Sequence, residues 1–546
     1  MRMASMYGLV FSLAIISYVS VFCKKISEVP NIVFIVADDL GWDDVSFHGS
    51  EQVLTPNIDL LAYTGVALER FYSHSVCTPS RAALLTGKYA YTMGMHGYPL
   101  TNAEDRGLPI NEKILPQYLK TLGYATHLIG KWHLGHSRSE YFPNNRGFDS
   151  YFGHRGGFID YYEYTCEETW RTGPVSGLDL FRNTSAAWDV EGYITDIYTK
   201  EAVNVVKNHD KSKPLFLMVS HNAPHAGNNG ALLQAPPATV RSMRHVESQE
   251  RRIFSAMVKK LDDSVGDIIE SLSDKQMLNN TIILFLSDNG GAYQKKYPNF
   301  ASNWPLRGTK FSPFEGGQRV VGLVWSPLVN TTNHLLKGFV HAVDWLPTIL
   351  TAAGLDPPTE IDGIDQWNSI LNNEDSIRNE IFDIYDDNHA VFKSAIIGDF
   401  KLITGVVEEY DYKGGDVRGI IGKGPSYVDA IKTCKMHSIL YSTGIKFDMN
   451  DINLRNDIRV KCKNTEYNMP LCIPDNDKVC LYNIKEDPCE KRDLSSTHPD
   501  IVRNLLSRLQ IELKRTKERV WPLIRDPRGR PSAHNYTWTS WADNLA

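Results

Sequence analysis

Unbroken runs of apolar residues recur along the first half of the chain. They cover residues 31–37, 125–129, 215–219 and 281–286. Runs of this length without polar alternation are typical of strands buried on both faces of a parallel sheet. Helical segments are predicted between them, over residues 57–63, 115–122, 194–208 and 251–272. This alternation of strand and helix predicts an α/β fold.

Each apolar run ends in polar residues that can carry chemistry. These residues are Asp38 and Asp39, Lys131 and His133, His221 and His225, and Asp288 and Asn289. In open α/β sheets the ligand binds outside the carboxyl ends of the strands. We therefore expect these side chains to converge on one site.

The acidic strand ends favour a metal site. Asp38, Asp39, Asp288 and Asn289 offer only oxygen ligands, a set that suits Ca²⁺ or Mg²⁺ and not zinc. Taken alone, paired aspartates after a strand form a turn or a helix cap more often than a metal site, and Asp-Asn-Gly-Gly is an ordinary turn sequence. It is their joint occurrence at strand ends that indicates an ion.

A further helix is predicted to begin at or just after Cys77. Pro79 suits a first helical turn, residues 82–85 are strong helix formers, and Gly87 is a good stop. Free backbone N–H groups, together with Arg81 one turn further on, would face whatever Cys77 carries. A thiol in this position is expected to have a lowered pKa and to be reactive. A buried structural cysteine is the alternative.

The segment Cys77-Thr-Pro-Ser-Arg81, followed by Leu85-Thr-Gly87, resembles the sulfatase signature. Further segments that match the family are Gly130-Lys-Trp-His-Leu-Gly135, Arg146-Gly-Phe-Asp149 and Asp344-Trp-Leu-Pro-Thr348. The resemblance spans residues 31–371 and continues more loosely beyond them. It implies an alkaline-phosphatase/sulfatase-like fold, with a large, mixed, mostly parallel sheet flanked by helices and a smaller C-terminal domain.

The similarity is to the arylsulfatase B-like (N-acetylgalactosamine-4-sulfatase-like) branch of the sulfatases. This branch acts on sulfated N-acetylgalactosamine in glycosaminoglycans, whereas near relatives take aryl sulfates or other small sulfated metabolites. The expected partner is therefore a sulfated carbohydrate or a small sulfate ester. Related phosphatases of the same fold use an unmodified Ser or Thr and usually two zinc ions, which the Cys-Thr-Pro-Ser-Arg segment disfavours.

The resemblance also implies a role for each candidate residue. Cys77 is expected to be converted to Cα-formylglycine by the formylglycine-generating enzyme, and its hydrate to act as the nucleophile. The expected catalytic residues are Cys77, Arg81, Lys131, His133, His225 and Lys310. The expected ligands of one Ca²⁺ ion, with Mg²⁺ less favoured, are Asp38, Asp39, Cys77, Asp288 and Asn289. His225 is preferred over His221, which is then expected to pack or to support the site. Without conversion of Cys77, the chain would be a secreted binding protein.

The N-terminus indicates a secretory route. An uncharged apolar run covers residues 3–23, between Arg2 and Lys24. We interpret residues 1–23 as a cleaved signal peptide, with an uncleaved membrane anchor as the alternative. A lysosomal or extracellular location follows, with no stable membrane insertion after cleavage. Glycans are expected at the Asn-x-Ser/Thr sequons that begin at Asn183, Asn279, Asn330 and Asn535.

The cysteines agree with an oxidising compartment. Apart from Cys23 in the signal peptide and Cys77, the chain contains Cys166, Cys434, Cys462, Cys472, Cys480 and Cys489. An even set in a secreted chain predicts three disulfides. The pairing of Cys480 with Cys489 is favoured because these residues flank a short predicted strand and an Asp-Pro turn.

The length and net charge of the chain restrict its class and its partners. The chain has 546 residues and a net charge of −6, with 42% hydrophobic and 22% charged residues. Such a chain can form a large core and a smaller unit. The negative charge argues against nucleic acid as a partner, because phosphate binding needs a basic face.

Two structural units are predicted. They are a catalytic domain over residues 24–375 and a C-terminal α+β subdomain over residues 376–546, joined by an acidic linker over residues 372–387. In the second unit, strands are expected at 390–397, 401–404 and 479–484, and a helix at 498–519. Residues 411–468 contain no recognisable motif. Basic residues between 514 and 530 predict a solvated helix end, with contact to a polyanionic substrate as the alternative.

Overall fold

The computed structural model describes residues 29–293, 297–330, 332–387, 390–408, 419–462, 471–519 and 525–543. The predicted signal peptide, residues 1–23, lies outside these ranges. Among the helices that the structure describes, none combines the length and the apolar character needed to cross a bilayer.

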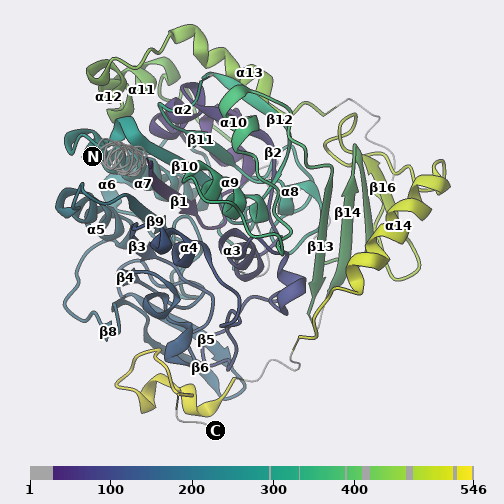
Figure 1. Cartoon of the computed structure of the whole chain (residues 1–546), viewed down its shortest axis with the longest axis horizontal. Helices are drawn as coiled ribbons and strands as arrows, with labels where there is room; N and C mark the ends of the chain where they lie inside the picture. Colours follow the sequence, from purple (N-terminus) through teal and green to yellow (C-terminus); the bar gives the residue numbers. More distant parts are fainter. Residues whose placement is uncertain are drawn as a thin grey trace, which may run out of the picture.

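A ten-stranded sheet forms the centre of the molecule, with the strand order β12-β2-β11-β10-β1-β9-β3-β4-β7-β8 (Figure 1). The predicted apolar runs are its strands β1 (Asn31–Ala37), β3 (Ala125–Gly130), β9 (Leu215–Ser220) and β10 (Thr281–Ser287). These strands are parallel neighbours, and every residue of β1, β9 and β10 is buried. Burial on both faces explains why their sequences show no polar alternation.

The outer strands make the sheet mixed. They are β2 (Val66–Tyr72), β4 (Ser150–Gly153), β7 (Phe181–Arg182), β8 (Ser185–Ala186), β11 (Gly322–Trp325) and β12 (His334–His341). Strand β11 is antiparallel to both β10 and β2, and β7 is antiparallel to β4. A separate hairpin consists of β5 (Thr165–Trp170) and β6 (Gly173–Leu178).

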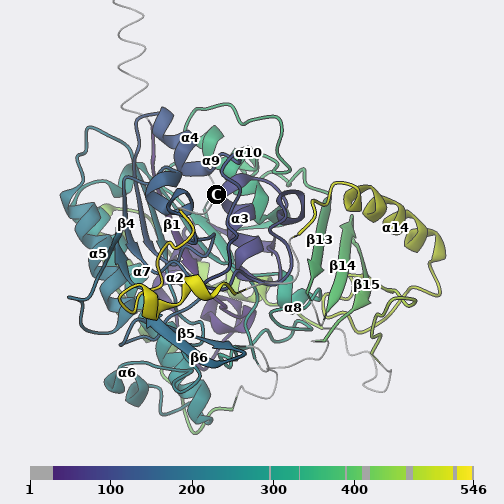
Figure 2. The ribbon, with the colours of Figure 1, turned by 90° about the horizontal axis from the view of Figure 1, so that it is seen from below.

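Two apolar layers enclose the large sheet, and β1 contributes alternate residues to each. Val33 and Ile35 face a layer with helices α2 (Pro56–Tyr63), α5 (Ile194–Asn208) and α7 (Gln249–Asp274). Ile32 and Phe34 face α3 (Cys77–Thr86), α4 (Leu115–Thr121) and α9 (Trp345–Ala352). In Figure 2, α4 and α9 lie above β1 and α7 lies below it. The predicted α/β architecture is therefore confirmed.

A four-stranded antiparallel sheet lies beside the large one (Figure 1). Its strands are β13 (Glu380–Asp386), β14 (Val391–Ile397), β15 (Phe400–Val406) and β16 (Cys480–Asn483). Helix α14 (Pro499–Leu513) packs Leu505 and Leu509 against this sheet. The predicted strands and helix of the tail are thus confirmed, although the helix ends at residue 513 and not at 519.

The prediction of a linker over residues 372–387 is wrong, because β13 lies within it. The acidic residues in this segment hid the apolar alternation. Asp383 is buried despite its charge, since its carboxylate accepts from His74 Nδ1 at 2.5 Å and from Gln318 Nε2 at 2.7 Å. Helix α10 (Trp367–Asn372) precedes the strand.

Parts of the tail also pack on the large sheet. Within the segment 411–468, helices α11 (Tyr427–Thr433), α12 (Lys435–Thr443) and α13 (Leu454–Ile458) bury Ile431, Met436 and Ile458, respectively, in the layer that contains α2 and α7. Near the C-terminus, Trp538 Nε1 donates to the carbonyl of Cys166 on β5 at 2.9 Å. The division of the chain at residue 375 stays a prediction. The remaining short helices are α6 (Pro237–Ser242) and α8 (Glu315–Gln318).

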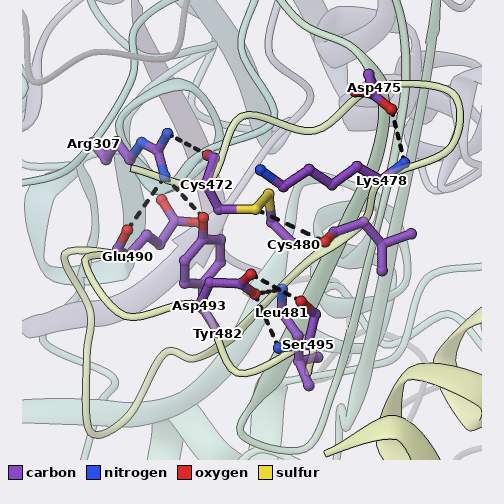
Figure 3. The surroundings of a disulfide bond; sticks show 11 residues. Arg307, Cys472, Asp475, Lys478, Cys480, Leu481, Tyr482, Glu490, Asp493 and Ser495 are labelled. Atoms are coloured by element: carbon purple, nitrogen blue, oxygen red, sulfur yellow. Dashed lines mark hydrogen bonds between the residues drawn. A yellow bond between two sulfur atoms is a disulfide. The ribbon is translucent and has the colours of Figure 1, made fainter. Parts of the chain in front are cut away.

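Two disulfides lie beside the small sheet in the described structure. Cys472–Cys480 joins the start of β16 to the preceding loop (Figure 3), and Cys462–Cys489 joins two residues outside the strands. The favoured pairing of Cys480 with Cys489 is therefore wrong. Spacing could not distinguish the partners, because Cys472 is only 8 residues from Cys480 on the other side. Cys166 and Cys434 are buried free thiols, so the third predicted disulfide does not form among the described cysteines.

Arg307 ties the small sheet to the large domain (Figure 3). Its guanidinium donates to the carbonyls of Cys472 and Glu490, at 2.8 Å and 3.3 Å, and to Tyr482 Oη at 2.9 Å. Arg307 lies three residues before Lys310, a candidate catalytic residue. The small sheet therefore supports the loop that carries Lys310.

A buried ion cluster reinforces this junction. Lys401 on β15 lies 2.8 Å from Glu315 Oε1 and 3.2 Å from Glu490 Oε1, and all three side chains are inaccessible to solvent. Burial raises the pKa of Glu490 to about 7, against the opposing charge of Lys401. The lysine is thus the counter-charge for two buried carboxylates.

We expect Lys401→Met to destabilise the protein by about 3–5 kcal/mol, because it removes the nearest cation from two buried carboxylates and leaves Glu315 only the more distant Arg319, at 3.7 Å. Chemical denaturation followed by circular dichroism measures the loss. The matched control is Lys393→Met on the adjacent strand β14, where the lysine is partly exposed. Equal stability of the two variants would contradict the role of Lys401.

Candidate active site

Cys77 is the first residue of α3, as the sequence predicts. Val76 before it is extended, with φ −151°, so the chain turns into the helix at the cysteine. The side chain is almost completely buried, with 2% exposed. Burial raises the pKa of the Cys77 thiol, although the charges of Lys131 and Lys310 act in the opposite direction. The predicted lowering of this pKa is therefore wrong, because desolvation outweighs the favourable charges.

Three buried cations each pair with one carboxylate around Cys77. The pairs are Lys131 Nζ with Asp38 Oδ2 at 2.7 Å, Lys310 Nζ with Asp39 Oδ2 at 2.8 Å, and Arg81 Nε with Asp288 Oδ2 at 3.0 Å. All six side chains are at most 2% exposed. Strand ends, α3 and the loop after β10 thus converge on one charged and buried site, as expected from the four strands.

The carboxylates are oriented by backbone and amide groups. Asn289 Nδ2 donates to Asp39 Oδ1 at 2.6 Å, and the backbone N–H of Asp39 faces Asp288 Oδ1 at 3.3 Å. Asp39 itself has a left-handed backbone, with φ 61°. This conformation is uncommon outside glycine and turns the chain sharply at the end of β1. Burial raises the pKa of Asp288, and the charge of Asp38 adds to this effect.

Two buried oxygens of this cluster lack a hydrogen bond within the described part of the chain, Asp38 Oδ1 and Asn289 Oδ1. Arg81 Nη2 lies 3.8 Å from Asp38 Oδ1, which is beyond hydrogen-bond distance. Asp38, Asp39 and His225 each offer a ligand atom, and these atoms lie within 4.8 Å of one another. Unsatisfied buried oxygens are costly, and carboxylate and amide oxygens are hard ligands. The residues present therefore fit a hard divalent cation.

His225 lies between Asp39 and Lys310. Its Nδ1 faces the carbonyl of Ala226 at 2.7 Å and must carry the proton there. Nε2 is then left to accept from Lys310 Nζ at 3.1 Å, with Asp39 Oδ2 at 3.4 Å. Burial lowers the pKa of His225 well below its ordinary value, so the imidazole is neutral. Phe158 stacks on the ring with a centroid distance of 5.6 Å.

His133 approaches from the end of β3. Its Nε2 faces the carbonyl of Leu100 at 2.8 Å, which places the proton on Nε2. Thr78 next to Cys77 donates to the His133 carbonyl at 3.1 Å. His133 Nδ1 is buried and has no hydrogen bond to any described residue, so it is left as an acceptor. Burial, reinforced by Lys131, lowers the pKa of His133 well below its ordinary value.

His221 does not join this group. Its Nε2 lies 3.1 Å from Ser264 Oγ on α7, at the opposite layer of the sheet. Burial lowers its pKa to about 3. The structure thus gives His221 a packing environment and His225 the charged one.

Two residues of the site were missed in the sequence. Ser220 accepts a short hydrogen bond from Arg81 Nη1. Asn299 donates to the carbonyls of Asp39 and Pro224, at 2.9 Å and 3.0 Å, and joins the ends of β1 and β9. Ser220 could have been found as the polar residue that ends its strand. Asn299 lies in a loop without a recognisable motif, so the sequence gives no indication of its role.

The chain is similar to proteins of one known family. Residues 30–355 match the family model described as Sulfatase, which is more than half of the chain. The chain belongs to the sulfatase family. It is therefore a sulfuric ester hydrolase, and members of this family typically use formylglycine and a divalent metal ion.

Individual proteins that are similar to this sulfatase are consistent with its family. Arylsulfatase J of Mus musculus is 34% identical over 519 residues, covering 94% of this chain and 80% of that protein. N-acetylgalactosamine-6-sulfatase of Homo sapiens is 32% identical over 358 residues, covering 63% and 66%. A crystal structure of Ps i-CgsB in complex with k-i-k-neocarrahexaose is 26% identical, with a TM-score of 0.70 over 91% of this chain and 95% of that chain.

The surface and the disulfides fit a secretory protein. Asn183, Asn279, Asn330 and Asn535 are all exposed, as attachment of a glycan requires. Two disulfides indicate folding in an oxidising compartment. Glycosylation itself and the catalytic and metal-binding roles of the named residues stay predictions.

Proposed function

We propose that this sulfatase removes sulfate from N-acetylgalactosamine residues of glycosaminoglycans, as sulfatases of the arylsulfatase B-like branch do. Cys77 would be converted to formylglycine by the formylglycine-generating enzyme, and one Ca²⁺ ion would be bound. The observation that carries the sulfate-cleaving part of the proposal is the position of Cys77 at the start of α3, buried among three cation–carboxylate pairs.

The metal-binding part of the proposal rests on the oxygen cluster. Asp38, Asp39, Asp288 and Asn289, with an oxygen of the modified residue 77, would hold the ion. The unsatisfied Oδ1 atoms of Asp38 and Asn289 support this set. When bound, such an ion polarises the sulfate and favours the deprotonated form of a hydroxyl beside it. Calcium is preferred over magnesium because it accepts irregular sets of carboxylate and amide ligands.

The nucleophile also comes from residue 77. Hydration of the aldehyde supplies one hydroxyl that attacks sulfur and a second that expels the sulfate. The chain's own residues prepare this chemistry. His133 Nδ1, unpaired within the described structure, would orient a hydroxyl of residue 77, and Asp288 would accept its proton.

The cations would hold the sulfate group. Lys131, Lys310 and Arg81 are fixed by their carboxylates before substrate arrives and are shielded from water. Preorganised charges in a dry site stabilise developing negative charge without reorganisation. Binding of an anionic group among them would use charge that is already in place.

His225 would protonate the departing alcohol. Its Nε2 would first take up a proton from solvent, which the negative charge of a bound sulfate ester favours, and would then release it to the leaving oxygen. Lys310 Nζ, which donates to the same atom in the free protein, keeps its own proton, because the neighbouring Asp39 raises the pKa of Lys310. This arrangement places the acid and one sulfate-binding cation side by side. The role of His225 should therefore depend on how much help the leaving group needs.

We expect His225→Ala to reduce kcat for a sugar sulfate by about 10²–10⁴-fold, the usual contribution of general acid catalysis. An aryl sulfate with an acidic phenol should be affected much less, because its phenolate leaves without a proton. The two rates are measured on the same protein preparations. His221→Ala is the matched control. An equal loss for both substrates would contradict the assignment of His225 as the acid.

A substrate panel tests the proposed function. Sulfated N-acetylgalactosamine is suggested by the name of the human relative, and an oligosaccharide by the k-i-k-neocarrahexaose bound in the similar crystal structure. Glycosaminoglycan fragments carrying 4-sulfate or 6-sulfate are compared with small aryl sulfates by release of inorganic sulfate. We expect the highest kcat/KM for a fragment that ends in sulfated N-acetylgalactosamine. Hydrolysis of aryl sulfates alone would refute the proposed substrate.

A further inference from the structure

A cavity lies at the edge of the large sheet. It has a volume of about 810 Å³, a size typical of ligand sites. Its walls come from β2, the edge strand β12, residues 454–461 around α13, and the turn at 484–488 after β16. None of the residues that line it in the described structure is among the candidate catalytic or metal-binding residues.

The lining of this cavity is basic. Its charged side chains are the basic residues Arg70, Arg319, Lys337, Arg459, Lys461 and Lys485 and the acidic residues Glu69, Asp457 and Glu486. The excess is positive although the whole chain carries a net charge of −6. A hollow surface with one sign of charge concentrates ligands of the opposite sign. We call this feature the basic cavity.

Several of these cations are available to a ligand. Lys337, Arg459 and Lys461 form no ion pair with any other residue that the structure describes. Arg319 is held in place, with its side chain 4% exposed, by the Glu69 carbonyl at 2.9 Å and by Glu315 at 3.7 Å. Arg70 and Lys485 share Asp399, at 3.6 Å and 3.7 Å, so the positive charge left for a ligand is that of Lys337, Arg459 and Lys461.

The basic residues between 514 and 530, considered above as an alternative contact for a polyanion, differ from the cavity in their ion pairs. Arg515 pairs with Glu512 at 2.6 Å, Arg525 with Glu168 at 2.9 Å, and Arg528 with Asp526 at 2.6 Å. These three charges are already neutralised within the chain, and Arg530 donates to Thr172 Oγ1 and lies over the Trp170 ring. The observations therefore favour the basic cavity over the tail as an anion-binding surface.

Lys337 has an alternative interpretation. Strand β12 is an edge strand, and a lysine on an edge discourages pairing with another chain. However, its register shifts between Leu336 and Phe339, and such irregularities turn a side chain to a new direction. Edge protection also leaves unexplained why Arg459 and Lys461, from a distant segment, line the same hollow.

We propose that the basic cavity binds a sulfated segment of a polysaccharide substrate, remote from the sulfate that is cleaved. This inference rests on the proposed function, because it requires a polymeric, polyanionic substrate. Repeated sulfate groups would neutralise the unpaired cations in turn. A chain held at a second site also raises the effective concentration of its other sulfates near the active site.

Binding of a size-defined chondroitin sulfate oligosaccharide tests the proposal. The full chain carrying Cys77→Ser is used so that the probe is not hydrolysed. Adding Lys337→Ala with Lys461→Ala should weaken binding about tenfold at low ionic strength. The control pair Lys200→Ala with Lys207→Ala removes the same charge from exposed positions on α5 and should leave the Kd unchanged. Equal affinities of the two double variants would overturn the proposal.

Two further readouts sharpen the test. In the active enzyme, the Lys337→Ala/Lys461→Ala protein should show a raised KM for the polymer and an unchanged kcat/KM for a small aryl sulfate. Inorganic sulfate at matched ionic strength should not displace the oligosaccharide from the cavity, and displacement would indicate a simple anion site and overturn the proposal. Because binding is measured without turnover, the binding assay tests the basic cavity and the substrate panel tests the glycosaminoglycan substrate, so the two failures can be distinguished.

Discussion

The Cys77→Ser protein is expected to lose multiple turnover of sulfate esters, by a factor on the order of 10⁴ or more, as when a nucleophile is removed. Serine has one hydroxyl, whereas the hydrated aldehyde has two. The second hydroxyl is the group that releases sulfate, so a serine would stop after one attack or not react. The buried position accepts serine without a change in volume large enough to alter the fold. Steady-state release of sulfate measures the effect.

The matched control is Cys434→Ser. Cys434 is also a buried free cysteine; it occupies the N-cap position of α12, and its Sγ donates to the carbonyl of Ile431. We expect this variant to retain wild-type kcat. Multiple turnovers at the wild-type rate by the Cys77→Ser protein would refute the diol mechanism.

The second large effect is expected at Lys310. Lys310→Met should lower kcat/KM by about 10²–10³-fold, the typical loss of one preorganised charge that stabilises a transition state. Lys310 Nζ contacts both Asp39 Oδ2 and His225 Nε2, so its removal affects sulfate binding and the proton donor together. Kinetics on a glycosaminoglycan fragment measure the loss.

Lys207→Met on the exposed face of α5 serves as the control for charge removal. Circular dichroism of both variants separates catalysis from folding, since Lys310→Met also leaves Asp39 without its cation. A folded Lys310→Met protein with unchanged kcat/KM would contradict the proposed role of this lysine.

The central part of the fold was predictable because its physical signal is local. Strands buried on both faces cannot tolerate polar residues, so β1, β9 and β10 stand out as apolar runs. The polar residues directly after such runs must lie at one sheet edge. This position alone brings Asp38, Lys131 and Asp288 together, whereas the choice of His225 over His221 came from the family resemblance.

Features that depend on distant parts of the chain were not predictable. The disulfide partner of Cys480 depends on where the loop containing Cys472 lies, and the sequence spacing is uninformative. Strand β13 was obscured by Asp383, whose burial is explained only by His74 and Gln318. The pKa of Cys77 depends on how deeply the helix start is buried, which the motif does not reveal.

The small sheet also contributes more to the site than the sequence suggests. Asp383 on β13 holds His74, three residues before Cys77, and Arg307 holds the loop of Lys310 against β16. Both contacts hold segments that carry candidate catalytic residues, Cys77 and Lys310. The two sheets therefore cooperate in positioning the site.

The chemical state of residue 77 tests the central claim most directly. Mass spectrometry of the peptide containing residue 77, isolated from the active protein of its native source, identifies an aldehyde or a thiol. We expect the aldehyde, which aldehyde-specific labelling would confirm independently. An intact thiol in a protein that is fully active on sulfate esters would contradict the account.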